Sequence, residues 1–179
     1  MLLRRSRHAP VPPSVASPSS GRPATWRVGV LAATTALVVS GCVPTINVTA
    51  ADAAGDPLCA RVVLAVPETV LGQPKVRATG QATAAWGEAG AAITLTCGVE
   101  VPPPTTEECE SIQVVSGGVE QTFDWITTKD DNGWTYVSFG RDPAVAVQVP
   151  TALGLGQPTA ALIDLAGAIS QVETTRTCL

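Results

Sequence analysis

The chain has 179 residues and a net charge of −4, and its charged residues are divided unevenly along the sequence. Five of the eleven Lys and Arg residues precede Cys42, and all fifteen Asp and Glu residues follow it, so the part from Cys42 onward has a net charge of −9. This charge disfavours nucleic acid as a partner, because phosphate binding depends on basic residues. The only histidine is His8, so that part also lacks the imidazole that Ser-His-Asp triads, Cys-His dyads and imidazole-bound zinc sites require.

Residues 1–41 have the composition of an export signal. Five arginines precede an apolar core at residues 28–39, and the small residues Ser40 and Gly41 follow it. A basic segment, a core of about this length and small residues at the cleavage point define a secretory signal. The core is shorter than the roughly 20 apolar residues of a membrane span. We therefore predict that residues 1–41 are a cleaved signal peptide.

The end of this segment, Val39-Ser40-Gly41-Cys42, resembles the bacterial lipobox. In such signals a diacylglyceryl group is attached to the cysteine thiol, and cleavage leaves that cysteine as the first residue. We expect Cys42 to carry lipid, with fatty acids such as palmitate, and to anchor the chain on the extracytoplasmic face of the cell membrane. An uncleaved anchor from Trp26 through Val43 and secretion without lipid are the alternatives.

Residues 42–56 are predicted to be a flexible tether, because large apolar residues are few and Pro, Thr, Asn, Ala, Asp and Gly are frequent. Asp56-Pro57 then supplies a helix N-cap and a proline for the first turn. We expect a helix over Leu58–Leu64, ended by Pro67, and then a short strand or a loop over Lys75–Gln81.

The clearest strand lies at residues 93–101, where apolar and polar residues alternate up to a run of three prolines. Asn132-Gly133 predicts a type I′ hairpin turn, because both residues tolerate positive φ. The remaining strand signals are at residues 111–115, 122–128, 134–140 and 144–149.

The chain closes with residues 158–172, whose apolar residues recur at helical spacing. Successive strands joined by short turns imply an antiparallel sheet. The predicted fold is therefore a single α+β domain over residues 57–179. It would have an antiparallel sheet of about four to five strands, with N- and C-terminal helices packed on one face.

Four cysteines follow Cys42, and an even number in an exported chain predicts two disulfides. Three pairings are possible. We favour Cys59 with Cys178, which ties the ends of the domain, and Cys97 with Cys109, which closes the proline-rich loop. A zinc site is the rival explanation, but the cysteines lack paired C-x-x-C spacing.

Several of these residues are typical of one family. They are Cys59, Pro67, Trp86-Gly87, the block from Ile93 to Pro102 with Cys97-Gly98-Val99, the run Arg141-Asp142-Pro143-Ala144-Val145-Ala146-Val147, and the closing helix. Over about residues 57–178 the chain resembles an uncharacterised family of actinobacterial envelope proteins. The resemblance implies export and membrane association, and it supplies no activity, substrate or catalytic residue.

Few residues suggest chemistry, and each has a simpler explanation. Loop carboxylates could form the acid pair of a glycosidase, and Lys129–Gly133 could bind calcium. Arg141 could meet an anionic ligand, or it could pair with Asp142 and fix a turn. Because acids in loops are usually solvated, we predict no catalytic residue, metal site or cofactor. The acids considered are Glu107, Glu108, Glu110, Asp124, Asp130 and Asp131.

Trp86 and Trp134 are the candidates for a recognition face, because aromatic side chains supply large contact areas. We expect Trp125 to lie in the core. The predicted function is that of a non-enzymatic, lipid-anchored envelope protein with an interaction or assembly role. Its partner would be the membrane together with an unknown envelope protein or cell-wall component. A binding module for a small molecule or a cell-wall glycan is the alternative.

Overall fold

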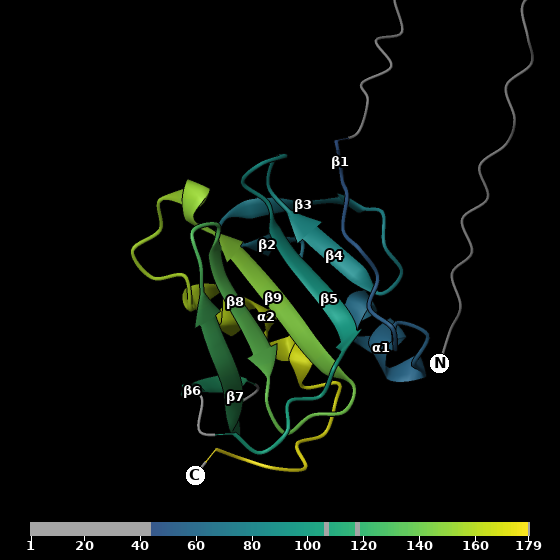
Figure 1. Cartoon of the computed structure of the whole chain (residues 1–179), viewed down its shortest axis with the longest axis vertical. Coiled ribbons are helices and arrows are strands. Elements are labelled where there is room, and N and C mark those ends of the chain that lie inside the picture. Colours follow the sequence, from purple (N-terminus) through teal and green to yellow (C-terminus); the bar gives the residue numbers. More distant parts are fainter. Residues whose placement is uncertain (1–43, 106–107, 117–118, 179) are drawn as a thin grey trace, which may run out of the picture. The chain divides into compact units, whose positions relative to one another are not determined.

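The computed structural model describes residues 44–105, 108–116 and 119–178 (Figure 1), so the predicted signal peptide and Cys42 lie outside the described residues. Among the helices within these ranges, none is long and apolar enough to span a membrane. The elements in chain order are β1 (Thr45–Ile46), α1 (Pro57–Ala65), β2 (Thr69–Val70), β3 (Gln73–Ala78), β4 (Thr83–Trp86), β5 (Ile93–Val99), β6 (Cys109–Ser116), β7 (Val119–Lys129), β8 (Gly133–Ser138), β9 (Ala144–Pro150), a 3₁₀ turn (Thr151–Leu153) and α2 (Ala160–Ile169).

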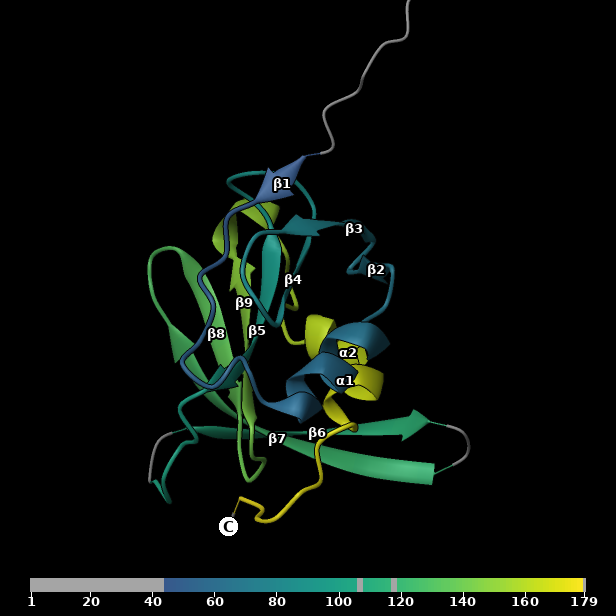
Figure 2. The same ribbon diagram turned by 90° about the vertical axis from the view of Figure 1, so that its right-hand side faces the viewer.

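The strands form one sheet in the order β1-β3-β4-β5-β9-β8-β7-β6, and β2 pairs with β3. The pairs are antiparallel except for β1 with β3, which run parallel. The sheet is strongly curved, with β2 and β3 at one end and the β6–β7 hairpin at the other (Figure 2). The two helices lie inside this curve and pack against each other, and α2 contacts β2, β6 and β9.

The predicted fold class is wrong in two respects. The described sheet has nine strands, not four to five, and the helices contact strands at both ends of the curve instead of covering one face of a flat sheet. The additional strands β2, β3 and β4 are short. In β4 all four residues are buried, so the strand lacks the alternation that marks a half-buried strand in a sequence.

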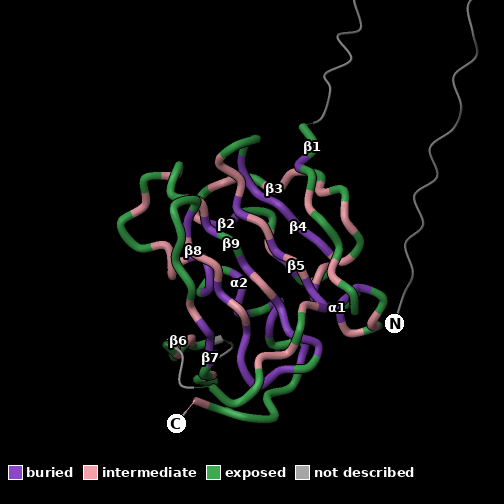
Figure 3. The backbone as a smooth tube through the Cα atoms, viewed as in Figure 1, coloured by how far each residue is buried: buried purple, intermediate pink, exposed green. Residues whose placement is uncertain are grey.

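The core lies between the concave side of the sheet and the helices. Buried residues follow β4, β5 and β9 through the middle of the sheet (Figure 3). The predicted alternation in β5 is confirmed as far as Cys97, because Ile93, Leu95 and Cys97 are buried and the threonines between them are half-buried. It does not continue to residue 101, because a bulge follows Cys97, Gly98 is buried and the strand ends at the half-buried Val99. The largest fully buried side chains are Trp86, Trp125, Tyr136, Ile93, Leu95, Leu162, Leu165 and Ile169.

The structure contains two disulfides, as predicted, but the favoured pairing is wrong. Cys59 is bonded to Cys97 and Cys109 to Cys178, with Cα–Cα distances of 5.5 and 6.3 Å. Because α1 packs on β5, Cys59 reaches the buried Cys97. Cys109 instead begins the outermost strand, where the C-terminal segment passes.

The segment predicted as a tether lies against the sheet over its described part. Ile46 in β1 is buried and pairs with β3, and the amide of Ala53 donates to the carbonyl of Gly98 at 3.1 Å. Gly98 has φ of +89° at a bulge in β5, and a Cβ there would overlap the backbone of Ala53. Asp56 then caps α1 as predicted, accepting from the amide of Leu58 at 2.7 Å.

The predicted hairpin between β7 and β8 is confirmed, but its turn is not type I′. Asn132 is absent from the residues with positive φ, which a type I′ turn requires at both central positions. The Asp130 carboxylate accepts hydrogen bonds from the amides of Asn132 and Gly133 at 2.8 and 2.9 Å. An aspartate side chain therefore shapes this turn.

The contact between Gly98 and Ala53 leads to a stability prediction. Gly90 has nearly the same φ, +88°, but a Cβ there would meet nothing within 4 Å. We expect Gly90→Ala to lower the free energy of unfolding of the full chain by about 1–2 kcal/mol, the ordinary effect of positive φ. Gly98→Ala should lower it by at least about 2 kcal/mol more, because residues 51–54 must move. Urea unfolding measures both, and equal losses would contradict the docking of this segment.

Candidate functional site

The β6–β7 hairpin extends past the strand and the helices beside it. Its two strands pair from Cys109↔Ile126 to Ser116↔Val119, whereas β8 pairs with β7 only from Trp125 onward. Residues 111–116 and 119–124 thus form a two-stranded ribbon, here called the β-arm. It projects beyond both helices (Figure 2).

The end of the β-arm exposes two apolar side chains. Val115 is 71 % and Val119 is 59 % exposed, and they are among the four large hydrophobic residues found exposed in the described chain. Val115 is opposite Glu120, and Val119 is opposite Ser116, so the two valines lie on opposite faces of the ribbon. Each face of the tip therefore presents one exposed valine.

The base of the β-arm is held by a buried carboxylate. Asp124 is only 6 % exposed and accepts hydrogen bonds from the Ser111 hydroxyl at 2.5 Å and from the Cys178 amide at 2.8 Å. Its backbone carbonyl accepts from the amide of Phe139. Together with the Cys109–Cys178 disulfide, Asp124 joins both strands of the arm to the C-terminal segment.

Asp124 is not brought together with Asp130 and Asp131, its predicted partners for an acid pair. Asp130 and Asp131 follow the far end of β7, about 20 Å along the strand at its usual rise per residue. Hydrogen bonds from the amides of Gly133 and Asn132 lower the pKa of Asp130 below its ordinary value. Among the described residues no group of three or more His, Cys, Asp or Glu is placed so that it could hold a metal ion.

Arg141 turns into the molecule and contacts the end of α2. It is 5 % exposed, and its Nη1 donates to the carbonyls of Val172 and Ile169 at the C-terminal end of α2. Its guanidinium lies 4.9 Å from the centre of the Phe123 ring. Burial lowers the pKa of Arg141, and the negative charge of Asp124 opposes that shift. The arginine therefore satisfies the carbonyls at a helix end, where a cation is favourable.

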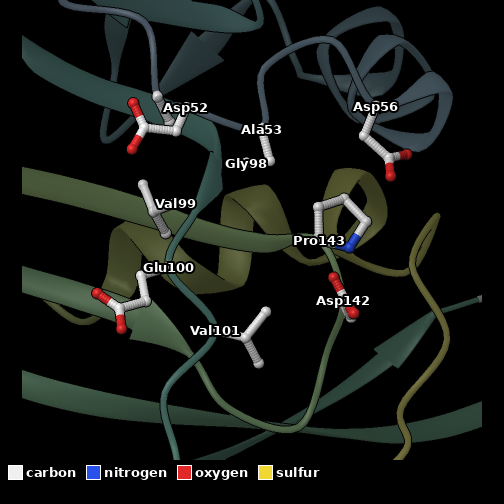
Figure 4. Close-up of a pocket in the computed structure, with 10 residues that line it drawn as sticks. Asp52, Ala53, Asp56, Gly98, Val99, Glu100, Val101, Asp142 and Pro143 are labelled. Atoms are coloured by element: carbon white, nitrogen blue, oxygen red, sulfur yellow. The ribbon is translucent and has the colours of Figure 1, made fainter.

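The four side chains Asp52, Asp56, Glu100 and Asp142 line an open cleft of about 580 Å³ around Gly98 (Figure 4). Asp52 and Glu100 lie on one side of it and Asp56 and Asp142 on the other. The neighbouring lining residues are Ala, Val, Gly and Pro. The cleft is therefore a concentrated negative patch of this acidic domain.

The two tryptophans predicted to form a recognition face have different environments. Trp86 is fully buried, and its indole N–H donates to the carbonyl of Pro67 at 2.9 Å, so the recognition role predicted for Trp86 is wrong. Trp134 is half-buried, and the ammonium of Lys129 lies 4.8 Å from its ring centre. Trp125 is in the core, as predicted.

The valines of the β-arm were not among the predicted site residues. Their sequence signal is the pair of strand segments on either side of Gly117-Gly118. That pattern predicts a hairpin, but exposure of its tip depends on where β8 and α2 end, which no local pattern gives. Of the acidic loop, Glu107 lies outside the described residues, Glu108 is exposed and Glu110 is half-buried.

Glu110 influences the single tyrosine of the chain. Burial, and to a smaller extent the charge of Glu110, raise the pKa of Tyr136 to about 12. Because this value exceeds the unfolded one of about 10, the tyrosine's contribution to stability is full below pH 10 and is lost as the pH rises towards 12. Ultraviolet titration of tyrosinate in the full chain should show this shift, and Glu110→Gln should reverse only the smaller part of it. Titration near pH 10 in the folded protein would contradict the burial of Tyr136.

Comparisons with known proteins agree with the expectation of an uncharacterised family. No curated protein and no solved structure matches the chain. The model of one family, described as "Protein of unknown function (DUF3515)", matches residues 23–178, which include the β-arm, both disulfides and the acidic cleft. The chain therefore belongs to the DUF3515 family of proteins of unknown function.

Proposed function

We propose that this chain is a non-enzymatic interaction protein that acts outside the cytoplasm and contacts a partner in the cell envelope through the β-arm. One observation carries the proposal: a two-stranded ribbon projects from the core and exposes Val115 and Val119 at its end. Both valines are accessible to a partner that approaches the end of the ribbon.

The construction of the β-arm supports this role. An isolated two-stranded hairpin is marginally stable in water. Here the Cys109–Cys178 disulfide and the hydrogen bonds of Asp124 hold its base, while the outer residues pair only with each other. The base is therefore fixed, and the tip remains available to a partner.

Two features support a location outside the cytoplasm. Two disulfides are typical of proteins that fold in an oxidising compartment. The lipobox-like Val39-Ser40-Gly41-Cys42 supports a lipid anchor at Cys42 on the cell membrane. Since Thr45 already pairs in the sheet, the chain between Cys42 and Thr45 spans at most about 10 Å.

The position of the β-arm relative to this anchor favours a partner beyond the lipid surface. β1 and β6 are the two outermost strands of the sheet order, and the β-arm lies at the opposite end of the curved sheet from β1 (Figure 2). A domain charge of −9 also repels anionic lipid headgroups. We therefore propose an envelope protein or a cell-wall component as the partner.

In-cell photo-crosslinking tests this function. A photoreactive amino acid at position 115 or 119 of the full chain should give one dominant protein adduct, because both side chains are exposed on the β-arm. Position 64 on α1 is the matched control, since Leu64 is 86 % exposed and is also apolar. Mass spectrometry of the membrane fraction identifies the adducts.

Equal yields at the three positions would contradict a specific role for the β-arm. Adducts only with lipid or glycan at positions 115 and 119 would favour the alternative, a binding module for a small molecule or a cell-wall glycan. Absence of adducts at both positions would remove the β-arm as the interaction surface.

A further inference from the structure

One margin of the sheet is the long strand β6. It pairs with β7 alone and ends the strand order, and it can be seen at the lower left in Figure 1. Its pairing with β7 is continuous over eight residues without a bulge. Proteins usually protect such an edge with lysine, proline or a bulge, because its free amides and carbonyls attract other strands. The sequence of β6 contains neither lysine nor proline.

The ladder shows which backbone groups of β6 point outward. The amide of Thr127 donates to the carbonyl of Glu108, which makes that pair a hydrogen-bonded one. In an antiparallel ladder such pairs alternate with pairs that direct their amides and carbonyls away from each other. With the observed register, the outward positions are Cys109, Ser111, Gln113 and Val115.

Both side-chain faces of this edge are suitable for a further strand. Ser111, Gln113 and Val115 are exposed on one face, while Ile112 and Val114 are half-buried on the other and pack against the core. A strand placed beside β6 would therefore have a solvated polar neighbourhood on one side and an apolar one on the other. This is the usual arrangement in recognition by strand addition.

We infer that an extended segment of a partner protein that carries Lys or Arg adds to the sheet along β6. The inference rests on the proposed interaction role of the β-arm and names the kind of partner. Charge favours a basic segment, because Glu108, Glu110 and Glu120 lie on or next to the β-arm and residues 107–128 contain no Lys or Arg. A second copy of this chain would bring another −9 and the same glutamates, so charge disfavours self-pairing.

Titration with defined peptides tests the inference. The probe is a short synthetic peptide of alternating lysine and valine, added to the isotope-labelled full chain in detergent micelles. We expect saturable changes in the amide NMR signals of Ser111, Gln113 and Val115. A peptide of alternating glutamate and valine should bind at least about tenfold more weakly because of charge repulsion. The lysine peptide with every backbone nitrogen methylated should lose binding, because neither of its edges can then donate to the ladder.

A matched pair of protein variants tests the same inference with the peptide left unchanged. Gln113→Pro removes an outward amide without removing a bond to β7, whereas Gln113→Thr keeps the amide. We expect Gln113→Pro to weaken binding of the lysine peptide by about tenfold or more and Gln113→Thr to change it less than threefold. If Gln113→Pro disturbs the fold, the methylated peptide still decides the question with the unaltered protein.

Signals of β6 that stay unchanged, or that respond equally to the lysine and glutamate peptides, would overturn the inference. Equal binding of the methylated peptide would overturn strand addition specifically. If the crosslinks from positions 115 and 119 persist at full yield in Gln113→Pro, the β-arm is still the interaction surface, but the partner does not bind by strand addition. Loss of those crosslinks in Gln113→Pro, but not in Gln113→Thr, is the result expected if both are correct.

Discussion

The packing of α1 and α2 inside the curve of the sheet is the constraint on which the other features depend. The buried residues of α2, including Leu162, Leu165 and Ile169, fill the space between the two ends of the sheet. α1 packs beside α2 and against β5, which brings Cys59 to Cys97. The sheet thus curves around an apolar filling, because an open sheet of nine twisted strands could not otherwise bury that surface.

The same packing explains the buried arginine. The chain leaves β8 at the point where α2 ends, so Arg141 meets carbonyls that have no partner within the helix. A buried guanidinium requires acceptors, which the carbonyls of Ile169 and Val172 supply. The Phe123 ring and the nearby negative charge of Asp124 further stabilise the cation. A residue that looks functional in the sequence thereby takes part in holding the helix end.

Local patterns predicted the elements that depend on local forces. The helix start at Asp56-Pro57, the alternation in β5, the hairpin after β7 and the closing helix all agree with the structure. The sheet size was missed because β4 is short, rich in alanine and buried on both faces, so only its long-range pairing defines it. The disulfide pairing depends on how α1 is placed on β5, which spacing along the chain does not determine.

The candidate site was harder to predict, because exposure is a property of the whole fold. Tryptophan is a common contact residue, but Trp86 belongs to β4, which lies within the sheet, and its side chain is buried. Val115 resembles any apolar strand residue, but β8 and α2 end before they can cover it. A partner strand along β6 would give the two-stranded β-arm a third strand, which the chain itself does not supply. Binding of the partner would therefore stabilise the β-arm. The edge that is a liability in the free domain is, in this scheme, the reason why a partner is bound.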